Sequence, residues 1–340
     1  MGFCKFIVMT ESLSFSEKKP IRWGVIGCGG VTEVKSVPAY QMTTGFEVAM
    51  VMRRDGKKAQ DYALRHAVPN WTTNAKEVIE NPDIDAIYIA TPPDSHLHYA
   101  LQVAQMGKVC CIEKPMAPNY KESLAIHKAF EERKLPLFIA YYRRSLPRFN
   151  KVKEWLEEKQ IGEVRHIHWQ KTKPPNDMDL NGIYNWRTDK SIAPGGYFDD
   201  LASHGLDLFT YLLGDIQKAS GIALNQQGLY GAFDSVSGSW VHKNGVTGTG
   251  SWNFGTYHRE DKVEILGSKG KISFAVLDEA PLVLENESGK QVLEVKNPKH
   301  IQEFHVANIK SHLLGKSIHP SLGESGLHTS WVMDKILGTS

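Results

Sequence analysis

Short apolar runs alternate with helix-forming segments up to about residue 145, and this alternation constrains the fold more than any other feature of the chain. The apolar runs have the length and composition of buried strands, and polar stretches with helical periodicity separate them. We expect strands at 21–26, 46–52, near 71, at 86–90, 109–112 and 137–142, and helices at 31–40, 55–66, 75–79, 95–106 and 120–133. Short connections of this kind favour a parallel sheet covered by helices, and right-handed crossovers make it doubly wound.

The pattern changes after about residue 145, which predicts a second domain of another class. We expect, in order, a helix at 150–159, a strand at 164–170, a polar loop at 171–194, a helix at 198–213, strands from 216 to 295, and helices at 298–314 and 322–337. Turn signals such as Lys243-Asn244-Gly245 separate the strands, which we interpret as an antiparallel meander.

Three segments follow from these patterns. We expect an N-terminal extension at 1–19, an α/β domain with a doubly wound parallel sheet at 20–144, and an α+β domain with a largely antiparallel sheet at 145–340. The apolar patch at 6–9 is too short for the core of a signal peptide.

Composition excludes several classes of protein. The 340 residues are 41% hydrophobic and 23% charged, and 40 basic residues nearly balance 38 acidic ones. This is typical of a globular protein whose main partner is neither nucleic acid nor a membrane, and no stretch is long enough to span a bilayer. The four cysteines, Cys4, Cys28, Cys110 and Cys111, form no C-x-x-C pair. We therefore expect no disulfide framework, no bound metal, and a reducing, cytoplasmic location.

A cluster of glycines follows the first expected strand and opens the first expected helix. Gly27 permits a tight turn, and Gly29, followed by Gly30 and Val31, lets the backbone approach a pyrophosphate, whose charge a helix N-terminus favours. The full dinucleotide-binding fingerprint has Gly or Ala where this chain has Thr32. Glycines also occur in ordinary strand-to-helix turns, but within the alternating pattern a dinucleotide site is the better interpretation.

The residues after the second expected strand bear on the choice of dinucleotide. An NAD site usually has Asp or Glu there, on the ribose 2′-hydroxyl, whereas this chain has Arg53 and Arg54. A guanidinium can bind a 2′-phosphate in a fork of charge-assisted hydrogen bonds, so we favour NADP over NAD. The alternative is a solvated helix entrance, since Asp55, Lys57 and Lys58 continue the run of charges.

Polar residues follow the fourth and fifth expected strands, at the edge where open α/β sheets bind their ligands. Thr91 and Pro92 leave the fourth strand and would lie against the cofactor. His96, in the first turn of the next helix, is either a cofactor contact or a surface residue near the helix cap. Glu113 and Lys114 leave the fifth strand, and Lys114 would face the nicotinamide.

The helix expected at 198–213 carries a second group of polar residues. Asp200 and His204 are four residues apart, so they share one face of a helix, and Asp207 continues that stripe. Such a stripe indicates a site, whereas a solvated Asp–His pair is the alternative. The glycines at 195–196 count against that alternative, because they would allow a ligand to approach closely.

Together these motifs resemble the glucose–fructose oxidoreductase and inositol dehydrogenase (Gfo/Idh/MocA) family. The resemblance extends from about Ile21 to the C-terminus, and the Glu-Lys-Pro and Asp-x-x-x-His elements are its specific parts. The shared elements are, in order, the glycine turn, Thr91-Pro92 with His96, Glu113-Lys114-Pro115, Trp186-Arg187, and Gly195-Gly196 followed by Asp200-x-x-x-His204.

The resemblance implies an N-terminal Rossmann domain and a C-terminal domain whose open-faced sheet often forms the oligomer interface. It implies a catalytic lysine at Lys114, with Asp200 and His204 completing the site. It also implies that Trp186 and Arg187 reach toward the cofactor. Related enzymes act on sugars, inositols, dihydrodiols and biliverdin, so the resemblance leaves the substrate open.

Two positions depart from the family pattern. Ala202 stands where the family usually has Gly in its Asp-x-Gly-x-His element, although Asp200 and His204 are both present. Arg53 stands where an acidic residue is common, which argues against NAD.

We therefore expect an NAD(P)-dependent dehydrogenase or reductase that transfers a hydride between nicotinamide and a secondary alcohol or carbonyl of a sugar, polyol or diol. Either His204 or Lys114 would take the hydroxyl proton, and the sequence leaves both assignments open. Two other functions stay in view: an NAD-dependent enzyme that cleaves glycosidic bonds by transient oxidation, and a non-catalytic dinucleotide-binding sensor. An uncovered sheet face in the second domain would need a partner, so we expect a homodimer or homotetramer.

Overall fold

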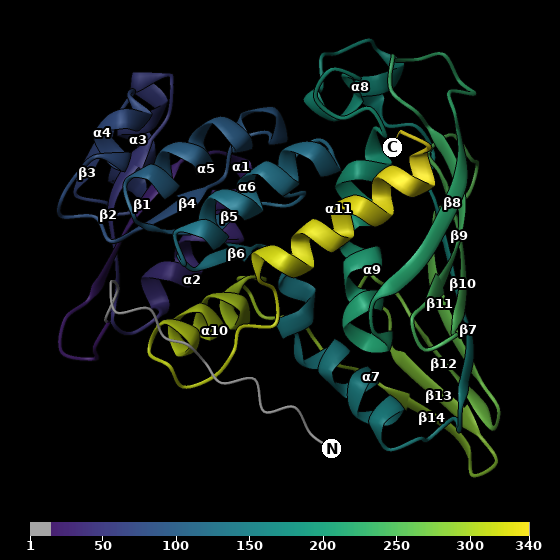
Figure 1. The fold of residues 1–340 in the computed structure, drawn as a ribbon. Helices are drawn as coiled ribbons and strands as arrows, with labels where there is room; N and C mark the ends of the chain where they lie inside the picture. The colour runs from purple at the N-terminus through teal and green to yellow at the C-terminus, as the bar shows by residue number, and fades with distance from the viewer. Residues whose placement is uncertain (1–14, 340) are drawn as a thin grey trace.

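The computed structural model describes residues 15–339, which form two adjoining domains (Figure 1). The first is built on a six-stranded sheet in the order β3-β2-β1-β4-β5-β6, in which all neighbouring strands are parallel. Its strands are β1 (Ile21–Ile26), β2 (Phe46–Met52), β3 (Asn70–Thr72), β4 (Ala86–Ile89), β5 (Val109–Ile112) and β6 (Leu137–Ile139). The strand order reverses beside β1, so the prediction of a doubly wound sheet is confirmed. Residues 1–14 of the expected extension lie outside the described residues.

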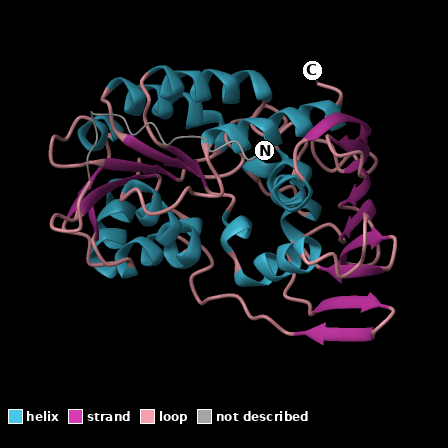
Figure 2. Ribbon diagram, turned by 60° about the horizontal axis from the view of Figure 1, so that its bottom comes forward, coloured by secondary structure: helices cyan, strands magenta, loops and turns pink. Residues whose placement is uncertain are grey.

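Helices cover both faces of this sheet (Figure 2). They are α1 (Gly30–Val34), α2 (Val37–Met42), α3 (Gly56–Arg65), α4 (Ala75–Ile79), α5 (His96–Gln105) and α6 (Tyr120–Glu132), with a 3-10 turn η1 (Pro93–Ser95) before α5. The single helix expected at 31–40 is wrong, because two short helices stand there. Pro38 has no N–H to donate to the Val34 carbonyl, which instead accepts a hydrogen bond from His300 Nδ1 at 2.6 Å.

The strands of the first sheet are buried on both faces, which explains why they appear in the sequence as continuous apolar runs. All residues of β4 and β5 are buried. Alternate side chains fill two separate cores, one containing Trp23 and Tyr88 and the other containing Ile87 and Phe130. The three described cysteines are free, buried thiols, and Cys4 lies outside the described residues.

The second domain contains an eight-stranded sheet in the order β14-β13-β12-β11-β7-β10-β9-β8. Its strands are β7 (Val164–Thr172), β8 (Ile216–Leu224), β9 (Ser235–His242), β10 (Thr247–Asn253), β11 (Glu260–Gly267), β12 (Gly270–Phe274), β13 (Leu282–Asn286) and β14 (Gly289–Leu293). The sheet is largely antiparallel, as predicted, but it is not a simple meander. β7 lies between β10 and β11 and runs parallel to β10, a long-range pairing that local turn signals do not encode.

Helices cover one face of this sheet, and in Figure 1 they lie only to its left. The remaining helical elements are α7 (Pro147–Glu157), α8 (Asp177–Leu180), α9 (Tyr197–Leu213), α10 (Glu303–Leu313), α11 (Gly323–Leu337), η2 (Tyr142–Ser145) and η3 (Trp186–Thr188). Trp169 of β7 packs edge-to-face on Phe209 of α9, with ring centroids 5.6 Å apart. Ser237, Ser239 and Thr247 on neighbouring strands are exposed, so part of the other face is polar and open.

The end of the chain returns to the first domain. Val306 and Ile309 of α10 lie in the same core as Trp23, and α11 packs against both α6 and α9. The boundary expected at 144/145 stays a prediction, and these contacts show that residues beyond 300 help to complete the first core.

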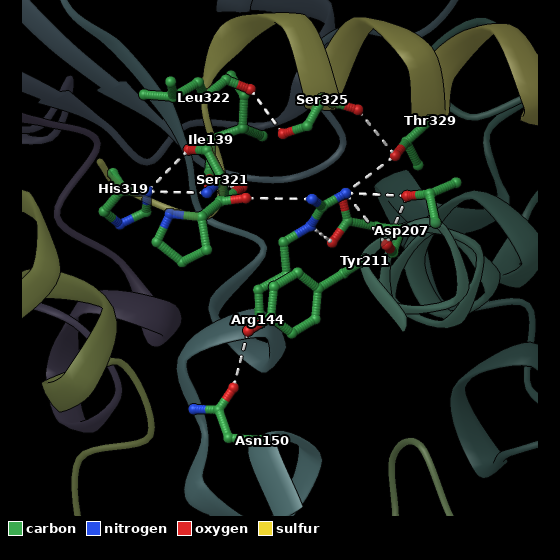
Figure 3. A network of polar contacts seen from close by, with 12 residues as sticks. Ile139, Arg144, Asn150, Asp207, Tyr211, His319, Ser321, Leu322, Ser325 and Thr329 are labelled. Atoms are coloured by element: carbon green, nitrogen blue, oxygen red, sulfur yellow. Dashed lines mark hydrogen bonds and ion pairs between the residues drawn. The ribbon is translucent and has the colours of Figure 1, made fainter. Parts of the chain in front are cut away.

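A buried ion pair holds α9 against the segment that follows β6 (Figure 3). Arg144 donates from Nε to Asp207 Oδ2 at 2.7 Å and from Nη2 to Asp207 Oδ1 at 2.8 Å, and Asp207 is fully buried. Thr329 of α11 donates to the same carboxylate at 3.2 Å, and Arg144 Nη1 donates to the Pro320 carbonyl at 3.1 Å. The prediction that Asp207 extends the polar stripe of the site is therefore wrong, because its carboxylate binds this structural arginine.

Candidate active site

The glycine turn lies at the carboxyl edge of the first sheet, directly against the end of β4. Gly27 has a φ of +95°, and a Cβ atom there would lie 2.8 Å from the Thr91 amide nitrogen, so only glycine fits. By contrast, a Cβ at Gly29 would meet nothing nearer than 3.9 Å, and one at Gly30 would meet nothing within 4 Å. The backbone of this turn is therefore open on the side where a dinucleotide phosphate would lie, and these residues fit that group.

Thr32 shows how the turn tolerates a departure from the glycine fingerprint. The residue is buried, and its hydroxyl donates to the Gly29 carbonyl at 2.7 Å. Its own carbonyl accepts a hydrogen bond from the Tyr62 hydroxyl of α3 at 2.9 Å. The threonine is thus fully hydrogen-bonded inside the turn instead of pointing toward a ligand.

The two arginines after β2 differ in their surroundings. Arg53 is half-buried and donates from Nη1 to the Cys28 carbonyl at 3.1 Å, so it lies beside the glycine turn. Arg54 is exposed. Of the two, Arg53 is the one in contact with the glycine turn, and its contact with a dinucleotide stays a prediction.

His96 is completely buried, which excludes the surface position considered above. Its Nε2 lies 2.8 Å from the Thr91 carbonyl oxygen, and its Nδ1 lies 3.1 Å from the Pro115 carbonyl oxygen. Burial lowers the pKa of the ring in spite of these acceptors. His96 therefore joins the segment after β4 to the segment after β5, and a direct contact of its ring with the cofactor stays a prediction, as it does for Thr91 and Pro92.

Glu113 is a buried carboxylate at the end of β5 that already has protein partners. Its Oε1 accepts hydrogen bonds from the Tyr88 hydroxyl and from Gln302 Nε2, the latter at 2.6 Å. Its Oε2 accepts the backbone N–H of Lys114 at 3.2 Å. Glu113 thus ties the start of α10 to the backbone that carries Lys114.

Lys114 and Asp200 meet where the two domains adjoin. The Lys114 ammonium donates to the Asp200 carbonyl at 2.7 Å and forms an ion pair with Asp200 Oδ1. The other carboxylate oxygen accepts from Arg187 Nε at 2.8 Å, and the Arg187 guanidinium lies 4.4 Å from the Trp186 ring centroid. Burial acts to raise the pKa of Asp200, but Lys114 and Arg187 outweigh it and hold that pKa below its usual value. The sequence therefore identified residues from β5, η3 and α9 that the fold brings together.

His204 lies one turn further along α9 and is buried. Its Nδ1 has no hydrogen-bond partner among the described residues, and its ring packs edge-on against Tyr142 with centroids 5.2 Å apart. Burial, followed by the positive charges of Arg143 and Lys114, holds the pKa of His204 well below its usual value. The ring is therefore a neutral imidazole near the Lys114 ammonium.

Sequence reasoning missed Tyr142 and Arg143, which follow β6 at the same sheet edge as Lys114. The rule that ligands bind beyond the carboxyl ends of parallel strands applies to β6 as well, so the signal was present. It also missed Gln302, whose role depends on a contact with Glu113 across 189 residues of chain.

Within residues 15–339 the structure shows neither a membrane-spanning helix nor a cluster of metal ligands. No helix there has both the length and the apolar character needed to cross a membrane. No cluster of three or more His, Cys, Asp or Glu side chains in that range could hold a metal ion.

Comparison with known proteins identifies the family. A model of the NAD-binding Rossmann fold of the Gfo/Idh/MocA oxidoreductases matches residues 21–141, and a model of the family's C-terminal domain matches residues 149–273. Oxidoreductase P35 of Formosa agariphila is 37% identical over 321 residues, covering 94% of this chain and 99% of that protein. The 1,5-anhydro-D-fructose reductase of Ensifer adhaerens is 25% identical over 315 residues, covering 90% and 92%.

A solved structure of levoglucosan dehydrogenase in complex with NADH has the same fold, with a TM-score of 0.86 at 22% identity over 94% of this chain and 97% of that one. The chain belongs to the Gfo/Idh/MocA family of NAD(P)-dependent oxidoreductases.

Proposed function

We propose that this chain interconverts a secondary alcohol and a carbonyl of a sugar or polyol, with Lys114, Asp200 and His204 at the reacting carbon. The observation that carries the proposal is the contact of Lys114, after the end of β5, with Asp200 of α9. Next to it lies the imidazole of His204, whose Nδ1 has no hydrogen-bond partner within residues 15–339. One residue comes from the dinucleotide-binding domain and two from the other domain. The 1,5-anhydro-D-fructose reductase relative supports a sugar as the substrate class.

A bound nicotinamide supplies the hydride chemistry, and the protein supplies placement and proton handling. The open backbone at Gly29 and Gly30 would hold the pyrophosphate, with Val31 following in α1. Lys114 would donate to the substrate oxygen and stabilise the negative charge that develops on it. Asp200 fixes the direction of that ammonium group, and Arg187 fixes Asp200.

The environment of His204 favours it over Lys114 as the proton acceptor. The lowered pKa keeps the ring neutral, and Nδ1 is buried without a hydrogen-bond partner among the described residues, so this nitrogen can accept the hydroxyl proton. The Lys114 ammonium, by contrast, already donates hydrogen bonds to two oxygens of Asp200. We therefore assign the base to His204 and the stabilising charge to Lys114.

Substitution of Lys114 or His204 tests the site. We expect Lys114→Ala and His204→Ala each to lower kcat at least about 100-fold, the lower end of what a general acid or base contributes. Nicotinamide fluorescence should show that both variants still bind the cofactor. Lys121→Ala and His98→Ala, which change exposed residues of the same types, serve as controls. Near-normal turnover by both active-site variants on a panel of sugars, polyols and diols would exclude the proposed site.

We propose further that the cofactor is NADP, on the position of Arg53 beside the glycine turn. We expect Arg53→Asp to weaken NADP binding by at least about tenfold, because a charged hydrogen bond contributes about 1.5–3 kcal/mol. Lys57→Asp makes the same change of charge at an exposed residue of α3 and should leave the preference unchanged. Equal affinities for NAD and NADP in the parent protein would contradict the assignment, and the bound NADH of the structural relative makes that comparison essential.

The open face of the second sheet supports a homodimer or homotetramer. No helix of the described chain covers this face, where residues of β9 and β10 are exposed (Figure 1). A second copy of the chain could pack against it. Light scattering at micromolar concentration tests this, and a monomeric mass would contradict it. Three free, buried thiols also support the proposal of a reducing, cytoplasmic location.

A further inference from the structure

Arg143 is a buried cation with which no carboxylate of residues 15–339 forms a direct ion pair. Only 7% of the residue is exposed, and its Nε donates to the Val276 carbonyl at 2.7 Å. Its Nη1 is buried without an acceptor, and no carboxylate in residues 15–339 forms an ion pair with it. The next residue, Arg144, is equally buried, but two of its nitrogens donate hydrogen bonds to the Asp207 carboxylate. Of these two neighbouring buried arginines, Arg144 is paired with a carboxylate, and Arg143 is paired with none in residues 15–339.

A guanidinium in this state is costly. Proteins rarely bury a charge unless it is paired, because an ion buried without compensation loses its hydration and gains nothing in return. Unsatisfied buried polar groups in native proteins mark strain, function or a missing partner. Among the described residues this charge is offset by the Val276 carbonyl, the Tyr142 ring and a longer-range attraction to Asp207, but by no direct ion pair, so an anion that arrives with a ligand is the simplest direct partner.

Arg143 also lies beside the reacting groups. It belongs to η2, which follows β6, and β6 pairs with β5, whose end carries Lys114. Its guanidinium carbon lies 5.0 Å from the Tyr142 ring centroid, and that ring is 5.2 Å from the imidazole of His204. Its charge is felt at His204, where it helps to depress the pKa. Because Arg143 and His204 both contact the Tyr142 ring, a single sugar-sized substrate could reach both side chains.

We propose that Arg143 binds a carboxylate of the substrate, so that the enzyme acts on acidic sugars such as uronic or aldonic acids. This inference rests on the proposed function and adds the substrate class. The planar guanidinium matches a carboxylate with two parallel hydrogen bonds. Asp200 would not repel such a substrate strongly, because Lys114 and Arg187 already neutralise it.

Binding of the anion would also change the chemistry at His204. The positive charge of Arg143 makes the imidazole a poorer base, and a bound carboxylate would offset that charge. The proton acceptor would then be more basic with an acidic substrate in place than with a neutral one. An acidic sugar would thus gain in kcat as well as in binding.

The test compares glucuronate with glucose and galacturonate with galactose, each with NAD and with NADP. We expect the acids to have kcat/KM values at least about tenfold higher than their neutral counterparts, as one charge-assisted contact provides. Arg143→Gln should remove that advantage by lowering kcat/KM for the acids, while the affinity for the cofactor stays within about twofold. Because the substitution also removes the charge that makes His204 a poorer base, kcat/KM for the neutral sugars should not fall. The matched control is Arg148→Gln. Arg148 is as buried and donates to the Ala280 carbonyl of the same loop, but it packs on Phe149 instead of Tyr142.

Several outcomes would overturn the inference. Neutral sugars turned over as well as acids by the parent protein would do so while leaving the proposed function intact. Faster turnover of glucose 6-phosphate or glucose 6-sulfate than of glucuronate would overturn the choice of a carboxylate. Loss of cofactor affinity in Arg143→Gln would place Arg143 in the cofactor site instead. Failure of every sugar, acidic or neutral, with cofactor bound would count against the proposed function itself.

The comparison of acids with neutral sugars in the parent protein needs no variant, so it holds even if Arg143→Gln does not fold. Arg143→Lys supplies a further check, because it keeps the charge and loses the fork. We expect it to retain part of the preference for acids, and an unchanged ratio in Arg143→Lys and Arg143→Gln alike would contradict the role of this side chain.

Discussion

The buried pair of Arg144 and Asp207 provides the sharpest test of how the two domains are held in register. Asp207→Asn keeps the size of the side chain but removes its charge, and it leaves the Arg144 guanidinium buried opposite an amide. Breaking a buried ion pair by removing one partner costs about 3–5 kcal/mol. The structure supports the upper part of that range, because Arg144 donates twice to the carboxylate and Asp207 is fully buried.

Urea unfolding followed by tryptophan fluorescence measures this cost. The matched control is Asp215→Asn, because Asp215 pairs with Lys243 at the same 2.7 Å, with both side chains more than half exposed. A surface pair of this kind contributes about 0–1 kcal/mol. The double variant Arg144→Met with Asp207→Leu should be more stable than either single variant, because it leaves no unpaired buried charge.

Unfolding of these variants also tests whether the Arg144–Asp207 pair holds α9 in place. If Asp207→Asn lowers the free energy of unfolding by less than about 1 kcal/mol, as the surface control does, then the buried pair contributes no more to stability than an exposed one. Additive losses in the double variant would show that the two side chains do not depend on each other. Since α9 carries Asp200 and His204, we also expect Asp207→Asn to lower kcat more than it lowers cofactor affinity.

Two further predictions concern the glycine turn and acid stability. Gly27→Ala places a Cβ 2.8 Å from the Thr91 nitrogen, so we expect it to lower both the cofactor affinity and the Tm. Gly107→Ala is the control, because Gly107 also has a positive φ but no atom lies within 4 Å of the new Cβ. Equal effects of the two substitutions would contradict the steric argument. Burial lowers the pKa of His319 to about 3, against about 6.5 in an unfolded chain, so its neutral ring stabilises the fold above pH 6.5 and that stability is lost as the pH falls toward 3. At pH 5, His319→Gln should reduce the slope of unfolding free energy against pH by about 1.4 kcal/mol per unit, and an unchanged slope would contradict the assignment.

Local features of the sequence were sufficient to predict the first sheet and the residues that approach one another from opposite domains. Buried parallel strands appear as unbroken apolar runs, and the residue after such a run lies at the edge of the sheet, which is why Lys114 could be found. The helical spacing of Asp200 and His204 was equally local. The pairing of β7 with β10 was not, because the two strands are far apart in the chain and no turn joins them.

The partners of buried polar groups were the other feature that sequence reasoning could not supply. Asp207 has the spacing of a site residue, and only its contact with Arg144 shows a structural role. The sequence left His96 as either a surface residue or a cofactor contact. In the structure its ring nitrogens lie within hydrogen-bond distance of carbonyl oxygens from two separate segments. In both cases the side chain is polar and the spacing is suggestive, but the three-dimensional partner decides the role.

The return of α10 to the first core has a consequence for how the protein is made. Val306 and Ile309 complete the packing around Trp23, yet they are synthesised almost three hundred residues after it. The dinucleotide-binding domain therefore cannot reach its final packing while the ribosome is still translating the second domain. The apolar surface around Trp23 therefore stays incompletely covered until α10 has been synthesised.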